Sequence, residues 1–174
     1  MNKKTLWLCR TAVMIAILVA LQFVTKPLGQ FVTGSCVNMV LVVATLCGGL
    51  WCGFTVALIS PFAAFLVGVG PALIQIVPAI SVGNIVLILV YAFVYKKLDR
   101  AWLREGAAVI AAAVLKFAAL YLVVVKLLLP VLGLAEKQVA AMSAMFSWPQ
   151  LVTALIGGVL GVLVSIPVKK SMKK

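Results

Sequence analysis

Apolar stretches long enough to cross a membrane make up most of this 174-residue chain, and they restrict its fold more than any other feature. An α-helix rises about 1.5 Å per residue, so about 20 residues cross the hydrocarbon core of a bilayer. With 66% hydrophobic and 10% charged residues, the chain has too few charges to cover the surface of a soluble fold. We therefore predict an all-α, polytopic membrane protein, a compact bundle of six transmembrane helices at residues 7–24, 37–50, 53–69, 80–95, 106–129 and 148–168.

The six expected helices use up the sequence. We therefore expect a single transmembrane domain, residues 1–174, with no soluble domain beside it. No internal repeat of the kind found in many secondary transporters is evident. Lys3 and Lys4 precede the first apolar run, as they would in a secretory signal, but Arg10 and the lack of an A-x-A-like cleavage site indicate a helix that is retained.

The net charge of +12 is explained by membrane topology rather than by binding to nucleic acid. Eleven of the fifteen cations fall in three clusters, at the amino end, between the fourth and fifth expected helices, and at the carboxyl end. Six crossings place all three clusters on one side, which the positive-inside rule makes cytoplasmic, and such clusters also attract anionic lipid. We therefore expect both termini to be cytoplasmic. The clusters are Lys3, Lys4 and Arg10, then Lys96, Lys97, Arg100 and Arg104, then Lys169, Lys170, Lys173 and Lys174.

The residue types that most enzymes and ion pumps use are missing. The chain contains no histidine, which argues against the usual catalytic zinc site and against a histidine relay. Its three acids, Asp99, Glu105 and Glu136, fall in expected loops, so no carboxylate would carry protons or cations through the hydrocarbon. The four cysteines form no C-x-x-C pair and are interpreted as small apolar side chains. We therefore expect a non-catalytic chain without metal or cofactor.

Lysine is the ionisable residue that does lie in the expected hydrocarbon region. Lys116 is near the middle of the fifth helix, where an unpaired ammonium costs about 3 kcal/mol or more, so it must face protein, water or a ligand. Its alternatives are a structural hydrogen bond to carbonyls at a helix end and a contact with ligand. Lys126 is close to Pro130 at the outer surface, where it serves either as an interfacial anchor or as a ligand contact.

Further polar residues gather at the expected outer end. Asn84 lies about one turn into the fourth helix, and Trp148 and Gln150 flank the proline that opens the sixth. The free N–H groups of these two helix starts favour an anionic or carbonyl-bearing ligand. Gln75 lies in an outer loop that could close over the site, and Tyr121 could stack on the ligand. Each residue alone could equally be a cap or a hydrogen bond within the bundle.

Small residues recur at helical spacing in two helices. Ala12, Ala16 and Ala20 occupy every fourth position of the first helix and form one column on its surface. Such a column lets two backbones approach closely in lipid, either inside the bundle or against another protein. Gly157, Gly158, Gly161 and Ser165 of the sixth helix are predicted to pack within the bundle, and residues 48–53 to form a glycine-rich inner turn.

Taken together, these features resemble one family of membrane proteins. Six helices in 174 residues, the alanine column, Pro78-x-x-x-x-Gly83-Asn84 at the fourth helix, and Pro149-Gln150-Leu followed by a glycine-rich run are similar to the substrate-binding S components of energy-coupling factor (ECF) transporters. The resemblance spans the whole chain. It implies a subunit in the plasma membrane of a prokaryote that captures a vitamin or related micronutrient from outside.

The resemblance also implies partners and roles for particular residues. An S component associates with a transmembrane coupling subunit and two cytoplasmic ATPases, and is thought to topple in the membrane to release its cargo. The alanine motif of the family contacts the coupling subunit, which implies that role for Ala12, Ala16 and Ala20. The later helices and outer loops of the family form the ligand pocket, which implies ligand contacts at Asn84, Lys116, Lys126, Trp148 and Gln150.

The residues narrow the ligand class without choosing one ligand. S components for nickel and cobalt use amino-terminal histidine, so the resemblance implies an organic ligand for this chain. A buried lysine without an acid in the membrane favours a carboxylate or another phosphate-free anion, and the nearby aromatic residues could supply apolar or stacking contacts. Pantothenate, nicotinate, lipoate, biotin and a folate all satisfy these conditions.

Two other classes of function remain open. A self-sufficient small-solute transporter would need a continuous polar path, and the inner halves of the expected helices have almost no polar side chains. A non-catalytic membrane assembly subunit would explain the faces of small residues but not a lysine in mid-membrane.

Overall fold

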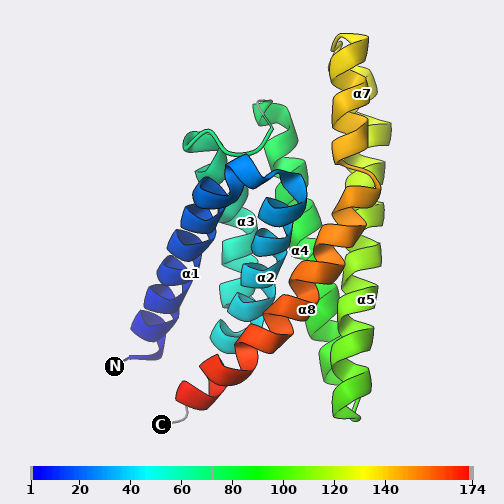
Figure 1. Cartoon of the computed structure of the whole chain (residues 1–174). Helices are drawn as coiled ribbons and strands as arrows, with labels where there is room; N and C mark the ends of the chain where they lie inside the picture. The colour runs from blue at the N-terminus through cyan, green and yellow to red at the C-terminus, as the bar shows by residue number, and fades with distance from the viewer. Residues whose placement is uncertain (1, 72, 173–174) are drawn as a thin grey trace.

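The structure is a computed structural model that describes residues 2–71 and 73–172, so Lys173 and Lys174 of the third basic cluster lie outside the described residues. Within this part of the chain the fold is all-helical, and six long helices form the bundle that the sequence predicts (Figure 1). These are α1 (Lys3–Thr25), α2 (Gln30–Gly48), α3 (Leu50–Leu66), α4 (Val77–Lys97), α5 (Ala101–Leu120) and α8 (Trp148–Ser171). Short elements connect them: η1 (Lys26–Leu28), η2 (Ile74–Ile76), the π-helix η3 (Tyr121–Leu128), α6 (Leu129–Val131) and α7 (Glu136–Met145).

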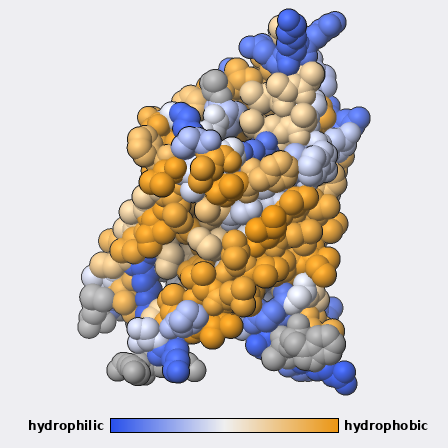
Figure 2. Space-filling model, in the orientation of Figure 1, coloured by the Kyte–Doolittle hydropathy of each residue, from blue (hydrophilic) through white to orange (hydrophobic). Residues whose placement is uncertain are grey.

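The bundle has the dimensions and surface of a membrane protein. Five of its helical segments are long and apolar enough to span a bilayer, and α3, at 17 residues, is a shorter apolar helix. Figure 2 shows a continuous hydrophobic band around the visible face, with hydrophilic residues at the two ends. The polytopic membrane fold is thus confirmed.

The observed helices differ from the expected ones at three places: the start of α2, the segment that contains α7, and the turn between α2 and α3. Helix α2 begins at Gln30, seven residues before the expected start, because Gly29 adopts φ 85° and turns the chain immediately after η1. The segment containing α7 was expected to be a loop because it is too polar to span a membrane, yet it forms a ten-residue helix. The expected turn at residues 48–53 narrows to Gly49, whose φ of 90° joins α2 directly to α3.

Helix α8 packs closely against α2 and α5 at its glycine residues. A Cβ atom added at Gly161 would lie 2.7 Å from Val42 Cβ and 2.9 Å from the Met39 carbonyl oxygen of α2. A Cβ added at Gly158 would lie 2.7 Å from Val109 Cγ1 of α5. Real side chains do not pack this tightly, so glycine is what allows α8 to lie against both helices. The predicted packing of this face within the bundle is confirmed.

The six long helices share one apolar core. Each contributes at least one buried residue, including Leu18 of α1, Leu41 of α2, Val56 of α3 and Leu87 of α4. Helix α1 stands at one edge of the bundle and α5 at the other (Figure 1). Both ends of the described chain lie at the end of the bundle that also holds the connection between α4 and α5. We call this end, which contains Lys96, Lys97, Arg100, Arg104, Lys169 and Lys170, the basic end.

Candidate functional site

A cavity of about 290 Å³ lies between the helices in the half of the bundle away from the basic end. It is bounded by the last residues of α1 and α3, the first residues of α2, α4 and α8, and one residue of α5. These ends meet because successive helices run in opposite directions through the bundle. The polar side chains of its wall are Gln22, Lys26, Gln30, Thr33, Asn38, Ser60, Asn84, Lys116 and Gln150.

The floor of the cavity is built around Lys116. Its Nζ atom donates hydrogen bonds to Asn38 Oδ1 of α2 at 2.6 Å and to Asn84 Oδ1 of α4 at 2.7 Å. All three side chains are at most 3% exposed. The ammonium is therefore held by side-chain amides of two neighbouring helices, and not by the helix-end carbonyls of the alternative interpretation. One of its three N–H donors is left for another acceptor.

Two buried polar atoms on the wall lack a hydrogen-bond partner among the described residues. They are the hydroxyl oxygen of Ser60, a residue that is 1% exposed, and the side-chain oxygen of Gln22. A buried polar atom without a partner costs about 1–3 kcal/mol. Orphaned atoms on the wall of a cavity point to an additional molecule that would bind there.

The mouth of the cavity is held together by hydrogen bonds to backbone carbonyls. Lys26 Nζ donates to the Gly68 carbonyl oxygen at 2.6 Å, which ties the end of α1 to the loop after α3. Gln30 Nε2 and Gln150 Nε2 both donate to the Met145 carbonyl oxygen, at 2.6 and 3.2 Å. Lys26, like Gly29 and Gly70, is exposed at the surface, so the cavity opens at this end of the bundle.

Of the seven ligand residues expected from the sequence, the structure brings Asn84, Lys116 and Gln150 together on the cavity wall. The other four do not line the cavity in the described part of the chain. Gln75 is exposed in η2, and Trp148 is 60% exposed, with its ring 5.5 Å from that of Phe31. Lys126 is exposed, and its Nζ lies 5.5 Å from the ring centre of Tyr121; both residues belong to the π-helix η3, which continues α5 away from the basic end.

Six polar wall residues were missed by sequence reasoning: Gln22, Lys26, Gln30, Thr33, Asn38 and Ser60. Asn38 was placed at the very start of a helix expected at residues 37–50, where an asparagine is an ordinary cap. In the structure α2 starts at Gln30, so Asn38 lies two turns inside the helix, a position at which a buried amide needs a reason. Ser60, just before Pro61, and Lys26 at the end of α1 gave no comparable signal.

The alanine column lies outside the cavity. Ala12, Ala16 and Ala20 are all exposed on α1, and Leu18 of the same helix is 1% exposed on the opposite, inward face. In the most apolar stretch of the α1 segment only 17% of the residues are buried, whereas 33–56% are buried in the corresponding stretches of the other four long spans. The column is therefore not used for packing inside this bundle.

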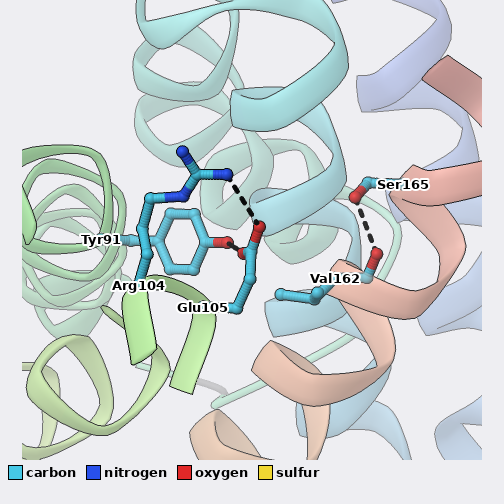
Figure 3. Close-up of polar contacts among 5 residues, drawn as sticks. All are labelled: Tyr91, Arg104, Glu105, Val162 and Ser165. Carbon is cyan, nitrogen blue, oxygen red and sulfur yellow. Dashed lines mark hydrogen bonds and ion pairs between the residues drawn. The ribbon is translucent and has the colours of Figure 1, made fainter. Parts of the chain in front are cut away.

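A second polar cluster lies at the basic end. Tyr91 Oη donates a hydrogen bond to Glu105 Oε2 at 2.7 Å, and Glu105 Oε1 lies 4.0 Å from Arg104 (Figure 3). None of these three residues lines the cavity, and the buried residues Leu41, Leu87 and Ile88 belong to the apolar core of the bundle. The cluster links α4 to α5, and the cavity does not extend to it.

The chain was compared with known proteins. A family model described as "ECF transporter, substrate-specific component" matches residues 10–169. Comparison with curated proteins gave no match, and comparison with solved structures gave none either. The match covers the whole bundle from α1 to α8, including every polar residue of the cavity wall.

Proposed function

This chain belongs to the substrate-specific components of ECF transporters, and from that premise we propose that its cavity captures a small, water-soluble organic anion from outside the cell. The observation that carries the proposal is a cavity with a buried lysine at its floor, held by two asparagine side chains. Burying a lysine in the membrane costs free energy, so such a residue usually marks a functional site. Binding an anion is the function that best suits a lysine at the floor of a cavity.

The chemistry of the wall supports a carboxylate-bearing vitamin or related micronutrient. Lys26 and Lys116 are cations on the wall, and no Asp or Glu lines the cavity in the described part of the chain. Phe65, Phe146 and Val37 offer apolar contacts for the body of the ligand. A volume of about 290 Å³ is at the small end of ligand sites, which usually hold roughly 300–1,000 Å³, and it favours nicotinate, lipoate, biotin or pantothenate over a folate.

Delivery depends, in this proposal, on the exposed face of α1. The alanine column would dock on a transmembrane coupling subunit, because small residues four apart allow close contact between helices in lipid. Two cytoplasmic ATPases would supply the energy, since the sequence contains no phosphate-binding loop. The chain would lie in the plasma membrane of a prokaryote with its basic end in the cytoplasm and the cavity open to the outside.

The alternative of a self-sufficient transporter finds less support. Below Lys116 the core is apolar, with Leu41, Val56, Leu87 and Ile88 all buried. A solute that reached the cavity floor would meet no polar path toward the basic end.

The proposal is tested by uptake into vesicles that contain the chain alone or together with a coupling subunit and ATPases. The ligand is first recovered from the gently purified chain and identified by mass spectrometry. We expect the chain alone to bind this compound and not to transport it, and we expect ATP-dependent uptake once the partners are added. Uptake by the chain alone would contradict the proposal, as would a purified chain that neither retains nor binds any small organic compound.

A further inference from the structure

The directions of the hydrogen bonds at the cavity floor indicate which chemical group of a substrate would bind there, a step that rests on the proposed function. A lysine ammonium has three donors and no acceptor. Because Lys116 donates to both Asn38 Oδ1 and Asn84 Oδ1, the two amide groups must turn their oxygen atoms toward it. Each asparagine therefore directs its NH₂ group, which is a pure donor, away from the lysine.

These amide nitrogens have no acceptor among the described residues. Neither Asn38 Nδ2 nor Asn84 Nδ2 donates a hydrogen bond in this part of the chain. Both residues line the cavity. The third N–H of Lys116 adds a further donor, and Ser60, whose hydroxyl can donate or accept, also lines the cavity without a partner among the described residues. Around Lys116 the floor therefore offers mainly donors, and the unpartnered oxygen of Gln22 is an acceptor elsewhere on the cavity wall.

We propose that this floor selects a carboxylate over the primary amide of the same shape, with Asn38 and Asn84 acting as positioning residues for Lys116. A carboxylate presents only acceptors and matches every donor of the floor. The corresponding amide presents an NH₂ group, which would point at another donor and leave both groups unsatisfied. Sites of this kind reject such analogues more strongly than sites that discriminate by size, because a mismatched polar group stays buried without a partner.

Matched acid and amide pairs test the selectivity directly. The probes are nicotinate and nicotinamide, lipoate and lipoamide, and biotin and its primary amide, together with the compound recovered from the purified chain. Dissociation constants are measured by isothermal titration on the whole purified protein. For the pair that fits the cavity we expect the acid to bind about 10- to 100-fold more tightly than the amide, the loss expected when one hydrogen bond to a charged group is replaced by a mismatch.

Asn38→Asp tests the positioning role. This substitution keeps the size of the side chain, replaces the NH₂ donor by a carboxylate oxygen and neutralises Lys116. We expect the preference for the acid to disappear, with the ratio of the two dissociation constants falling to about one or below. A purely structural role of Asn38 would weaken acid and amide equally and leave that ratio unchanged. Gln138→Glu on the exposed surface of α7 adds the same charge outside the cavity and should keep the parent ratio.

Each outcome bears on a different claim. An amide that binds as tightly as its acid overturns the selectivity inference and leaves the proposed capture function intact. A recovered compound without an anionic group overturns the selectivity inference and also the anionic character of the ligand in the proposed function. If the folded protein retains no compound and binds none of the probes, the proposed function itself fails. An unchanged acid-to-amide ratio in Asn38→Asp removes the positioning role alone.

Discussion

Lys116 is buried in the bundle without an acidic partner among the described residues. Amide oxygens of Asn38 and Asn84 compensate the loss of hydration, but unlike a carboxylate they do not cancel the charge. An Asp in either position would have formed a buried ion pair and left the cavity floor neutral. Two asparagines leave the ammonium without a neutralising acid among the described residues, so an anionic ligand would supply the missing negative charge.

Replacing Lys116 by Met should therefore remove most of the affinity for the ligand. The substitution keeps the length of the side chain and deletes a charge-assisted hydrogen bond worth about 1.5–3 kcal/mol, so affinity should fall about 10- to 100-fold. Lys126→Met is the control, because the exposed ammonium of Lys126 lies outside the cavity wall and its loss should cost much less. Isothermal titration with the recovered compound measures both. A Lys116→Met protein that binds like the parent would make the lysine purely structural.

The sequence indicated part of this site and missed part of it for a physical reason. Lys116 and Asn84 were detectable because a charge or an amide within an apolar helix is costly and needs a partner. Asn38 was missed because the start of α2 was set too late. That Lys116 faces Asn38 depends on how α2 and α5 are rotated about their axes. This rotation follows from packing of the whole bundle, which no local pattern records.

For single helices, too, some features could be predicted from the sequence and others could not. The length and hydropathy of the six long helices could be predicted, because the bilayer imposes both. The helix α7 was missed, since it is short and polar and is held by contacts of Val139, Met142 and Met145 with a neighbouring apolar cluster. The glycine face of α8 was predicted correctly, but its neighbours α2 and α5 came from the structure.

Helix α1 has two faces with different tasks, and Ala16→Leu should separate them. The added bulk would hold a docked helix away from the column, so assembly with the coupling subunit and transport should be lost. Affinity for the ligand should stay close to that of the parent, because Ala16 is exposed and does not line the cavity, whose first wall residue on α1 is Gln22. Co-purification with the partner complex and titration measure the two properties.

The control is Ala140→Leu, which adds the same bulk on the exposed surface of α7. It should leave both assembly and ligand affinity unchanged. Should Ala16→Leu weaken ligand binding as much as it weakens assembly, the column would belong to the core of the bundle and the docking role would have to be abandoned.

Helix α8 depends on glycine for its contact with α2, and Gly161→Ala should destabilise the bundle. The new methyl group would lie within 2.9 Å of the Met39 carbonyl oxygen and even closer to Val42. Overpacking of this kind costs about 1–3 kcal/mol, which should lower the melting temperature in detergent by several degrees. Gly106→Ala in α5 is the matched control, since a Cβ there has no neighbour within 4 Å. Equal melting temperatures for the two variants would show that the close approach of α8 is not required for stability.

At the scale of the whole molecule, the chain has a polar cavity toward one end and positive charge at the other. The two ends are separated by the hydrophobic band that Figure 2 shows. The positive-inside rule predicts the direction of this asymmetry: Asp99 would lie in the cytoplasm and α7 outside.

Cysteine labelling in intact cells tests this orientation. Gln138→Cys on α7 should react with a membrane-impermeant maleimide in intact cells, whereas Asp99→Cys, between α4 and α5, should react only after permeabilisation. The parent chain gives the background from its own four cysteines. Reaction of Asp99→Cys in intact cells, with protection of Gln138→Cys, would reverse the orientation and place the cavity mouth in the cytoplasm.

One helix takes part in both proposed interactions: α1 carries the alanine column on its exposed face and contributes Gln22 to the cavity wall, and Lys26 follows directly after it. Any coupling between the two sites through this helix must be reciprocal. If docking on the partner lowers the affinity for the cargo by some factor, bound cargo lowers the affinity for the partner by that same factor. A chain that has just released its cargo would then adhere to its partner more strongly than a loaded one, so the energy of the ATPases would be needed for separation as well as for release.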